Sequence, residues 1–288
     1  MASNQNKTRR RIPKAYADSE FLASPDARTV RILCEYFQPL RKFRENKVKD
    51  TIVFYGSART LERAPAQAAL EQARGLLAAD PQSEQIQARF QRAEADLRMS
   101  QYYEDARTLA RLLTEWSLAL PGPWGRFLVC SGGVPGIMEA ANRGASEAGG
   151  KTVGLTISLP FEPQGNEYIT GSLAMEFHYF FMRKYWFVYM ARALCVFPGG
   201  FGTMDELMDL LTLIQTQKIR RRLPLVMYGS EYWKEVLNID ALVKWGMISP
   251  QDTNLITYCD TPEAAFEYLT SALTHSNGLP RSRKARGG

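Results

Sequence analysis

The sequence has 288 residues, of which 45% are hydrophobic and 23% charged, a globular composition that excludes wholesale disorder. No stretch reaches the roughly 18 uncharged apolar residues of a membrane span, because the nearest candidate, residues 179–197, contains three cations. Residues 1–14 and 281–288 together carry nine positive charges and no acid, so the chain between them sums to −3 against +6 overall. We therefore expect a cytoplasmic protein with solvated basic tails, which binds neither a membrane nor a specific nucleic acid.

The predicted elements begin, after a basic flexible tail over residues 1–25, with a helix over residues 26–47. Six short apolar runs, separated by helical stretches, then predict strands: Thr51–Tyr55, Arg126–Cys130, Thr152–Ile157, Ala193–Phe197, Leu223–Tyr228 and Asn254–Tyr258. Apolar strands that alternate with helices are typical of a parallel sheet covered on both faces. The sequence therefore predicts an α/β fold, a Rossmann-like doubly wound parallel sheet with helices on both faces. It would form a single nucleotide-binding domain over residues 26–275, followed by a second flexible basic tail at 276–288.

Residues 61–119 contain more helix than one connection between strands requires. This insert is rich in Ala, Gln, Arg and Glu, and Asp80–Pro81 divides it into two helices. We expect an antiparallel hairpin or a long arm that packs on its own domain or on a partner subunit, without ligand chemistry of its own.

The strongest functional signal is the segment CVFPGGFGTMDE, which ends at Glu206. An apolar strand stops at Pro198, and a turn follows before Thr203, which is expected to open a helix. The turn has glycines that let a phosphate approach backbone N–H groups, at Gly199, Gly200 and Gly202. Glu206 lies one turn further on, where a carboxylate beside an anion indicates chemistry rather than phosphate binding. The structural alternative is that Thr203 caps the helix and Glu206 is its capping-box partner.

Two further glycine turns follow strands, SGGVPG at residues 131–136 and GSAR at residues 56–59. The carboxyl ends of parallel strands meet at one edge of a sheet, so the three turns should face one crevice. Neither turn has the GxGxxG spacing of a dinucleotide fingerprint or the GK[ST] of a P-loop. We therefore expect a ligand of mononucleotide size.

Arg183 and Lys184 stand alone in a strongly aromatic helical segment, residues 177–190. Adjacent helical residues point about 100° apart, so the two cations should have different roles. The alternative is a core helix with two charges at its edge.

The cysteines and histidines give no sign of a metal centre. The four cysteines form no CxxC pair, and three lie in apolar runs that predict buried thiols: Cys130, Cys195 and Cys259. The two histidines, His178 and His275, have no partner at metal-ligand spacing. We predict no metal site.

PGGFGTMDE, preceded by Met-Arg-Lys at residues 182–184, resembles the LONELY GUY (LOG) family of cytokinin riboside 5′-monophosphate phosphoribohydrolases, often labelled lysine decarboxylases. The resemblance covers about residues 50–274, and the N-terminal helix and helical insert are similar to the longer bacterial type. It implies a Rossmann-like fold, a homodimer or homohexamer, and hydrolysis of an N6-modified AMP to free base and ribose 5-phosphate. No cofactor is implied. The family's catalytic positions fall on Arg183 and Glu206.

By the same resemblance, Lys184 and Gly199–Thr203 fall on nucleotide-contacting positions. With the other turns, the predicted substrate contacts are Ser57, Arg59, Gly132, Gly133, Glu162, Lys184, Pro198, Gly199, Gly200, Phe201, Gly202 and Thr203.

Three alternatives remain open at this stage. The substrate can be plain AMP instead of a prenylated AMP, and the site can serve nucleotide binding or sensing without turnover. A pyridoxal phosphate-dependent decarboxylase would need a Schiff-base lysine, for which Lys184 is the only candidate. Arg183 beside it would repel the protonated imine, so we disfavour that alternative.

Overall fold

A computed structural model describes residues 12–121, 125–159 and 165–276 and confirms the predicted fold class. Seven parallel strands form one sheet in the order β4-β3-β2-β1-β5-β6-β7. The strands are β1 (Thr51–Tyr55), β2 (Leu128–Ser131), β3 (Thr152–Ile157), β4 (Ala174–Phe177), β5 (Ala191–Val196), β6 (Leu225–Tyr228) and β7 (Thr257–Cys259). The chain builds the sheet outward from β1 to β4 and then returns to β5 on the other side of β1. This reversal creates a switch point between β1 and β5, where doubly wound sheets bind ligands.

The strand prediction is correct for β1 and β3 and displaced at β2, β5, β6 and β7. Strand β4 is missed because its four residues have only a short alternation of exposed and buried side chains. The predicted strand Asn254–Tyr258 is wrong over its first half, because Pro250–Leu255 form the 3₁₀ helix η4. Ser249 and Asp252 close a capping box there, which fixes the helical turn and delays β7 to Thr257.

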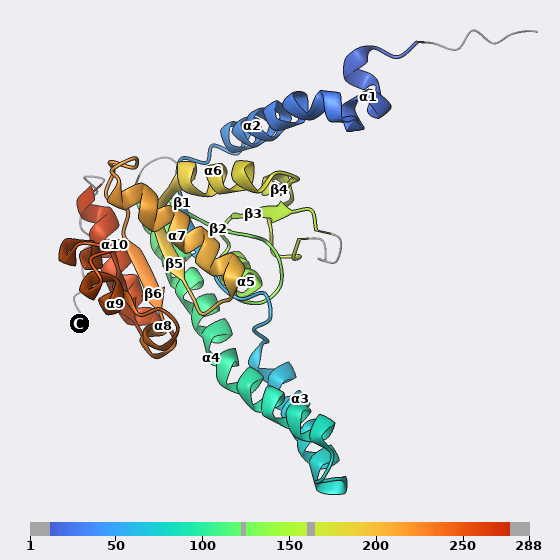
Figure 1. The fold of residues 1–288 in the computed structure, drawn as a ribbon. Coiled ribbons are helices and arrows are strands. Elements are labelled where there is room, and N and C mark those ends of the chain that lie inside the picture. Colours follow the sequence, from blue (N-terminus) through green and yellow to red (C-terminus); the bar gives the residue numbers. More distant parts are fainter. Residues whose placement is uncertain (1–11, 122–124, 160–164, 277–288) are drawn as a thin grey trace, which may run out of the picture.

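Helices cover both faces of the sheet (Figure 1). One apolar core lies between the sheet and α2 (Arg28–Glu45), α6 (Phe180–Met190), α7 (Phe201–Gln215) and α8 (Ser230–Val236). A second core on the opposite face involves α4 (Glu84–Ala119), α5 (Ile137–Glu147) and α10 (Pro262–Ser276). Strands β1, β3 and β5 are buried on both faces over most of their length, which explains their nearly continuous apolar sequences. A short helix, α9 (Ile239–Lys244), follows α8.

The helical insert forms a hairpin that extends away from the sheet. Helix α3 (Arg63–Ala79) runs back along the first half of α4, and the two are separated by the turn at Asp80–Pro81 that the sequence predicts. Figure 1 shows this hairpin projecting from the body, whereas the second half of α4 lies along the sheet. The projecting part has a small core of its own around Leu70, Ala73 and Ala93. We call residues 63–99 the arm.

The N-terminal segment also projects, with α2 lying against α6. The Trp186 indole donates to the Glu35 carbonyl oxygen at 2.9 Å, and Tyr36 packs on the Trp186 ring. The predicted apolar face of this helix is only partly covered, because Leu33 and Phe37 are 49% and 58% exposed. Helical structure begins before residue 25, the predicted end of the first tail: η1 (Ala15–Ala17), α1 (Ser19–Ala23) and η2 (Pro25–Ala27) precede α2.

Candidate active site

The glycine turn after β5 leads directly into α7. The helix begins at Phe201, two residues earlier than predicted, and Gly200 is its N-cap. The N–H groups of Thr203 and Met204 already bond to the Gly200 carbonyl oxygen, at 3.0 Å each. Those of Phe201 and Gly202 have no partner among the described residues. Such unpaired N–H groups at a helix N-terminus favour an anion.

The three glycines of this turn differ in whether the surrounding protein leaves room for a side chain. A Cβ on Gly199 would clash with the Thr203 hydroxyl and lie 3.0 Å from the Ser57 nitrogen, so Gly199 is needed for packing. A Cβ on Gly200 or Gly202 would meet nothing within 4 Å, and both residues line a cavity. No protein atom therefore requires these two glycines, and a side chain there would project into the open space of the cavity.

Hydrogen bonds join the three strand-end turns into one rim. The Ser57 N–H donates to the Pro198 carbonyl oxygen at 3.0 Å, and the Ser57 carbonyl accepts from the Ile137 N–H at 3.1 Å. Gly136 has φ of +79°, and a Cβ there would clash with the Ser57 carbonyl oxygen. The β1 turn is thus held between the β2 and β5 turns, as the strand order requires.

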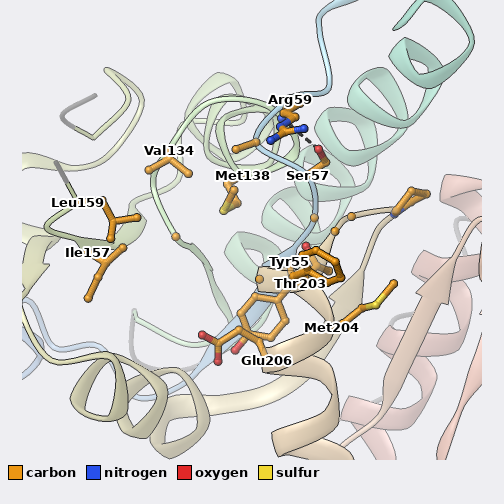
Figure 2. A pocket seen from close by; sticks show the side chains of 18 of the residues that line it. Tyr55, Ser57, Arg59, Val134, Met138, Ile157, Leu159, Thr203, Met204 and Glu206 are labelled. Atoms are coloured by element: carbon orange, nitrogen blue, oxygen red, sulfur yellow. Dashed lines mark hydrogen bonds between the residues drawn. The ribbon is translucent and has the colours of Figure 1, made fainter. Parts of the chain in front are cut away.

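Above the sheet edge lies a cavity of about 690 Å³, within the usual range for small-molecule sites. Figure 2 shows Glu206 and Arg59 at opposite ends of the view, with Thr203 between them and Ile157 and Leu159 to one side. The described predicted residues that line the cavity are Ser57, Arg59, Gly132, Arg183, Pro198, Gly199, Gly200, Phe201, Gly202, Thr203 and Glu206.

Two of the predicted contacts in the described part of the chain are not among the residues that line the cavity. Lys184 is not a lining residue, and its ammonium lies 2.8 Å from the Asp205 carboxylate and 3.9 Å from the Glu206 carboxylate. Gly133 is held by packing: it has φ of +73°, and a Cβ would lie 2.9 Å from the Ile169 and Thr156 side chains. Glu162 lies outside the described residues.

The two predicted catalytic side chains meet at the floor of the cavity. Arg183 on α6 places its Nη2 3.4 Å from the Glu206 Oε1 on α7. The guanidinium also lies over the rings of Phe180 and Phe187, at 5.2 and 5.8 Å from their centroids. The Arg183 Nε is buried without a hydrogen-bond partner among the described residues. A buried unpaired donor beside a cavity indicates that a ligand satisfies it.

Burial raises the pKa of Glu206, and the positive charges of Arg183 and Lys184 oppose that rise. The side chain is only 7% exposed. Because Gly200 is the N-cap and makes no side-chain cap bond, Glu206 is not a capping-box partner. The structural alternative for this carboxylate is therefore wrong. A buried carboxyl with a raised pKa next to a guanidinium is suited to proton transfer.

Several cavity residues were not singled out from the sequence. Tyr55 ends β1, and Tyr232 on α8 donates its hydroxyl to the Gly199 carbonyl at 2.8 Å. Both follow from strand order, since β1 and β6 flank β5. Arg92 and Met99 come from the arm, where no motif indicated a ligand contact.

Residues 138–269 match the family model "Possible lysine decarboxylase". This region of similarity includes α6, the β5 turn and α7, which carry Arg183 and Glu206, and excludes β1 and the arm. No curated protein matches the sequence.

Among solved structures, the chain is similar to the molybdenum cofactor binding protein from the phototrophic bacterium Rippkaea orientalis. The identity is 19% and the TM-score 0.44, over 60% of this chain and 88% of that chain. It is also similar to the molybdenum cofactor carrier protein MCP from Chlamydomonas reinhardtii. There the identity is 15% and the TM-score 0.45, over 78% of this chain and 99% of that chain.

The family description prompts a test for a pyridoxal phosphate site, and the described residues do not fit one. Among the lining residues that the structure describes there is no lysine, and the ammonium of Lys184 is paired with the Asp205 carboxylate. Within the described ranges, no cluster of three or more His, Cys, Asp and Glu side chains is arranged to bind a metal ion. In the same ranges, no helix has the length and apolarity needed to cross a membrane.

Proposed function

We propose that this protein hydrolyses the N-glycosidic bond of an adenosine 5′-monophosphate, releasing the free base and ribose 5-phosphate. The observation that carries the proposal is the Arg183–Glu206 pair beside a glycine turn whose open N–H groups suit a phosphate. The family match and the LOG-like motifs support the same activity. The turn alone would suit any phosphate ligand, whereas the buried carboxylate adds a group that can take part in bond cleavage.

In this proposal the 5′-phosphate binds the N–H groups of Phe201 and Gly202, with the Thr203 hydroxyl beside them. This contact holds the ribose over Glu206 and contributes binding energy remote from the reacting bond. The base lies toward the apolar wall formed by Ile157, Leu159 and Phe180.

The bond from C1′ to the base nitrogen breaks, and its electron pair leaves with the base. The Glu206 carboxylate stabilises the positive charge that develops on the ribose. It also accepts a proton from the water whose oxygen bonds to C1′. The Arg183 guanidinium stabilises the electron pair on the departing base, which then takes up one proton. The sum is nucleotide plus water giving base plus ribose 5-phosphate.

The exposure of the apolar wall at Phe180 helps to indicate which base the site would accept. Phe180 is 46% exposed and borders the cavity, so the base end is open rather than closed around an unmodified purine. A prenyl group at N6 would cover apolar surface here, and we propose the N6-modified nucleotide as the better substrate.

The test is incubation of the full-length protein with AMP and with isopentenyladenosine monophosphate, followed by chromatography of the released base. Base release from either, lost in Glu206→Gln, supports the proposal, and faster release from the prenylated nucleotide supports the specificity. Tight AMP binding without base release would refute hydrolysis and leave a nucleotide-binding or sensing protein.

A further inference from the structure

The arm contributes to the cavity wall and carries a charge there. Arg92 and Met99, both on α4, line the cavity, although most of the arm extends away from it. The Arg92 Nε bonds to Asp96 at 3.1 Å, an i,i+4 pair that directs the guanidinium, and the side chain is 58% exposed. Its two terminal nitrogens have no partner among the described residues.

A second arginine lies on the same cavity. Arg59 follows the β1 turn, where its N–H bonds to the Ser57 hydroxyl at 3.0 Å. Its guanidinium has no hydrogen-bond or ion-pair partner in the described part of the chain. Figure 2 shows it close to the turn and away from Glu206. Apart from the catalytic Arg183, these are the only cations among the described lining residues.

The position of the two arginines follows from the topology. Glu206 and Arg183 come from α7 and α6, which cover one face of the sheet, whereas Arg92 comes from the arm half of α4, whose second half packs on the other face. The cavity crosses the sheet edge between them, over the turns joined by Ser57. Figure 2 shows Arg59 on the far side of Thr203 from Glu206. A ligand with its ribose over Glu206 and its phosphate on the β5 turn would therefore reach toward Arg59 if it were extended beyond that phosphate, in a cavity that Arg92 also lines.

We infer that Arg92 and Arg59 form a second anion subsite, and that the cavity binds nucleoside 5′-diphosphates more tightly than monophosphates. The inference rests on the proposed orientation of the nucleotide. The first phosphate takes the N–H groups of the β5 turn, and the second takes the free guanidinium nitrogens. Arginine suits this role because its planar donors match phosphate oxygens. Asp96 is an acidic neighbour of Arg92, and its carboxylate forms an ion pair with the Arg92 Nε.

The test is equilibrium binding of AMP, ADP and inorganic pyrophosphate to the full-length protein by calorimetry. We expect ADP to bind about tenfold more tightly than AMP, the scale of one charge-assisted hydrogen bond. Arg92→Gln should remove most of that difference while changing AMP affinity by less than about threefold. The matched control is Arg89→Gln, one turn earlier on α4, because Arg89 bonds to Gln72 and is not a lining residue. It should keep the full difference.

Four outcomes would overturn the subsite, and the first three concern the comparison of AMP with ADP. These are equal AMP and ADP affinities, an unchanged difference in Arg92→Gln, or an equal loss for both nucleotides, which would place Arg92 on the first phosphate. Absence of binding by ADP and pyrophosphate would also overturn it. The proposed hydrolysis is judged separately by base release from AMP: an Arg92-dependent ADP preference without base release would support the subsite and refute the enzyme.

Discussion

Replacing the buried carboxylate by an amide of the same size isolates its charge. In Glu206→Gln the side chain stays 7% exposed in the same space, and an amide oxygen can still accept from Arg183, now 3.4 Å away. What is lost is a negative charge close to the developing ribose cation. Two unit charges about 4 Å apart, at an effective dielectric constant of about 20, interact by about 4 kcal/mol. That corresponds to roughly a 10³-fold fall in kcat.

The assay is the initial rate of base release, paired with calorimetric AMP binding. AMP affinity should stay within about tenfold of the wild type, because the phosphate contacts are unchanged. Asp209→Asn serves as the matched control, since Asp209 is another acid on α7 that does not line the cavity. It should keep kcat within about threefold. A kcat for Glu206→Gln near that of the wild type would refute a catalytic role for this carboxylate.

The raised pKa of Glu206 adds a pH test of the same substitution. The folded protein binds this proton more tightly than the unfolded chain, so the stabilisation is fully present below the ordinary pKa of 4.5 and lost as pH rises through the folded pKa. The stability of Glu206→Gln relative to wild type should therefore increase from about pH 4 to pH 8 in denaturant titrations. A constant difference would contradict the raised pKa. Activity of the wild type should fall as pH drops through that same pKa, because the carboxylate is the working form.

Three further predictions concern the phosphate turn, the arm and the assembly. Gly200→Val should weaken AMP binding far more than adenosine binding, because an added Cβ meets no protein atom within 4 Å and the branched side chain would stand in the proposed phosphate position. Gly171→Val, equally open at Cβ but outside the cavity, should change neither affinity, and equal losses in Gly200→Val would indicate a misfolded turn. Gly75→Ala in α3 should stabilise the arm by about 1 kcal/mol in thermal unfolding. Gly149→Ala, at a residue with φ of +76°, should instead destabilise the protein. A destabilising effect of Gly75→Ala would contradict the helix assignment. Light scattering of the wild type should give a mass that is a multiple of the 32.6 kDa chain mass. Phe37→Asp should lower this mass, whereas Met247→Asp, at an exposed apolar residue elsewhere, should leave it unchanged. A mass of one chain for the wild type would refute assembly.

Local sequence determined most of the fold. Strand β1 reads TIVFY and is buried at every position, so an uninterrupted apolar run was enough to place it. Asp80–Pro81 divided the insert correctly, because proline cannot continue a helix. Three cysteines in apolar runs are buried as predicted, and Cys34 is exposed. The β5 turn and Arg183 were singled out by motif, since glycines next to a helix start have few uses other than a close backbone approach.

Tertiary structure decided which of these residues share a site. Lys184 is adjacent to Arg183 in sequence, yet it does not line the cavity: its ammonium pairs with Asp205 and lies 3.9 Å from the Glu206 Oε2. Gly133 belongs to a glycine turn, but its φ and its neighbours show that packing requires it. Arg92 lies about 90 residues before Arg183 in the sequence, in a segment without any ligand signature. Periodicity along a chain reports which side of its own helix or strand a residue occupies. Only the strand order, which places β1 between β2 and β5, brings the arm, the three turns and the Arg183–Glu206 pair around one cavity.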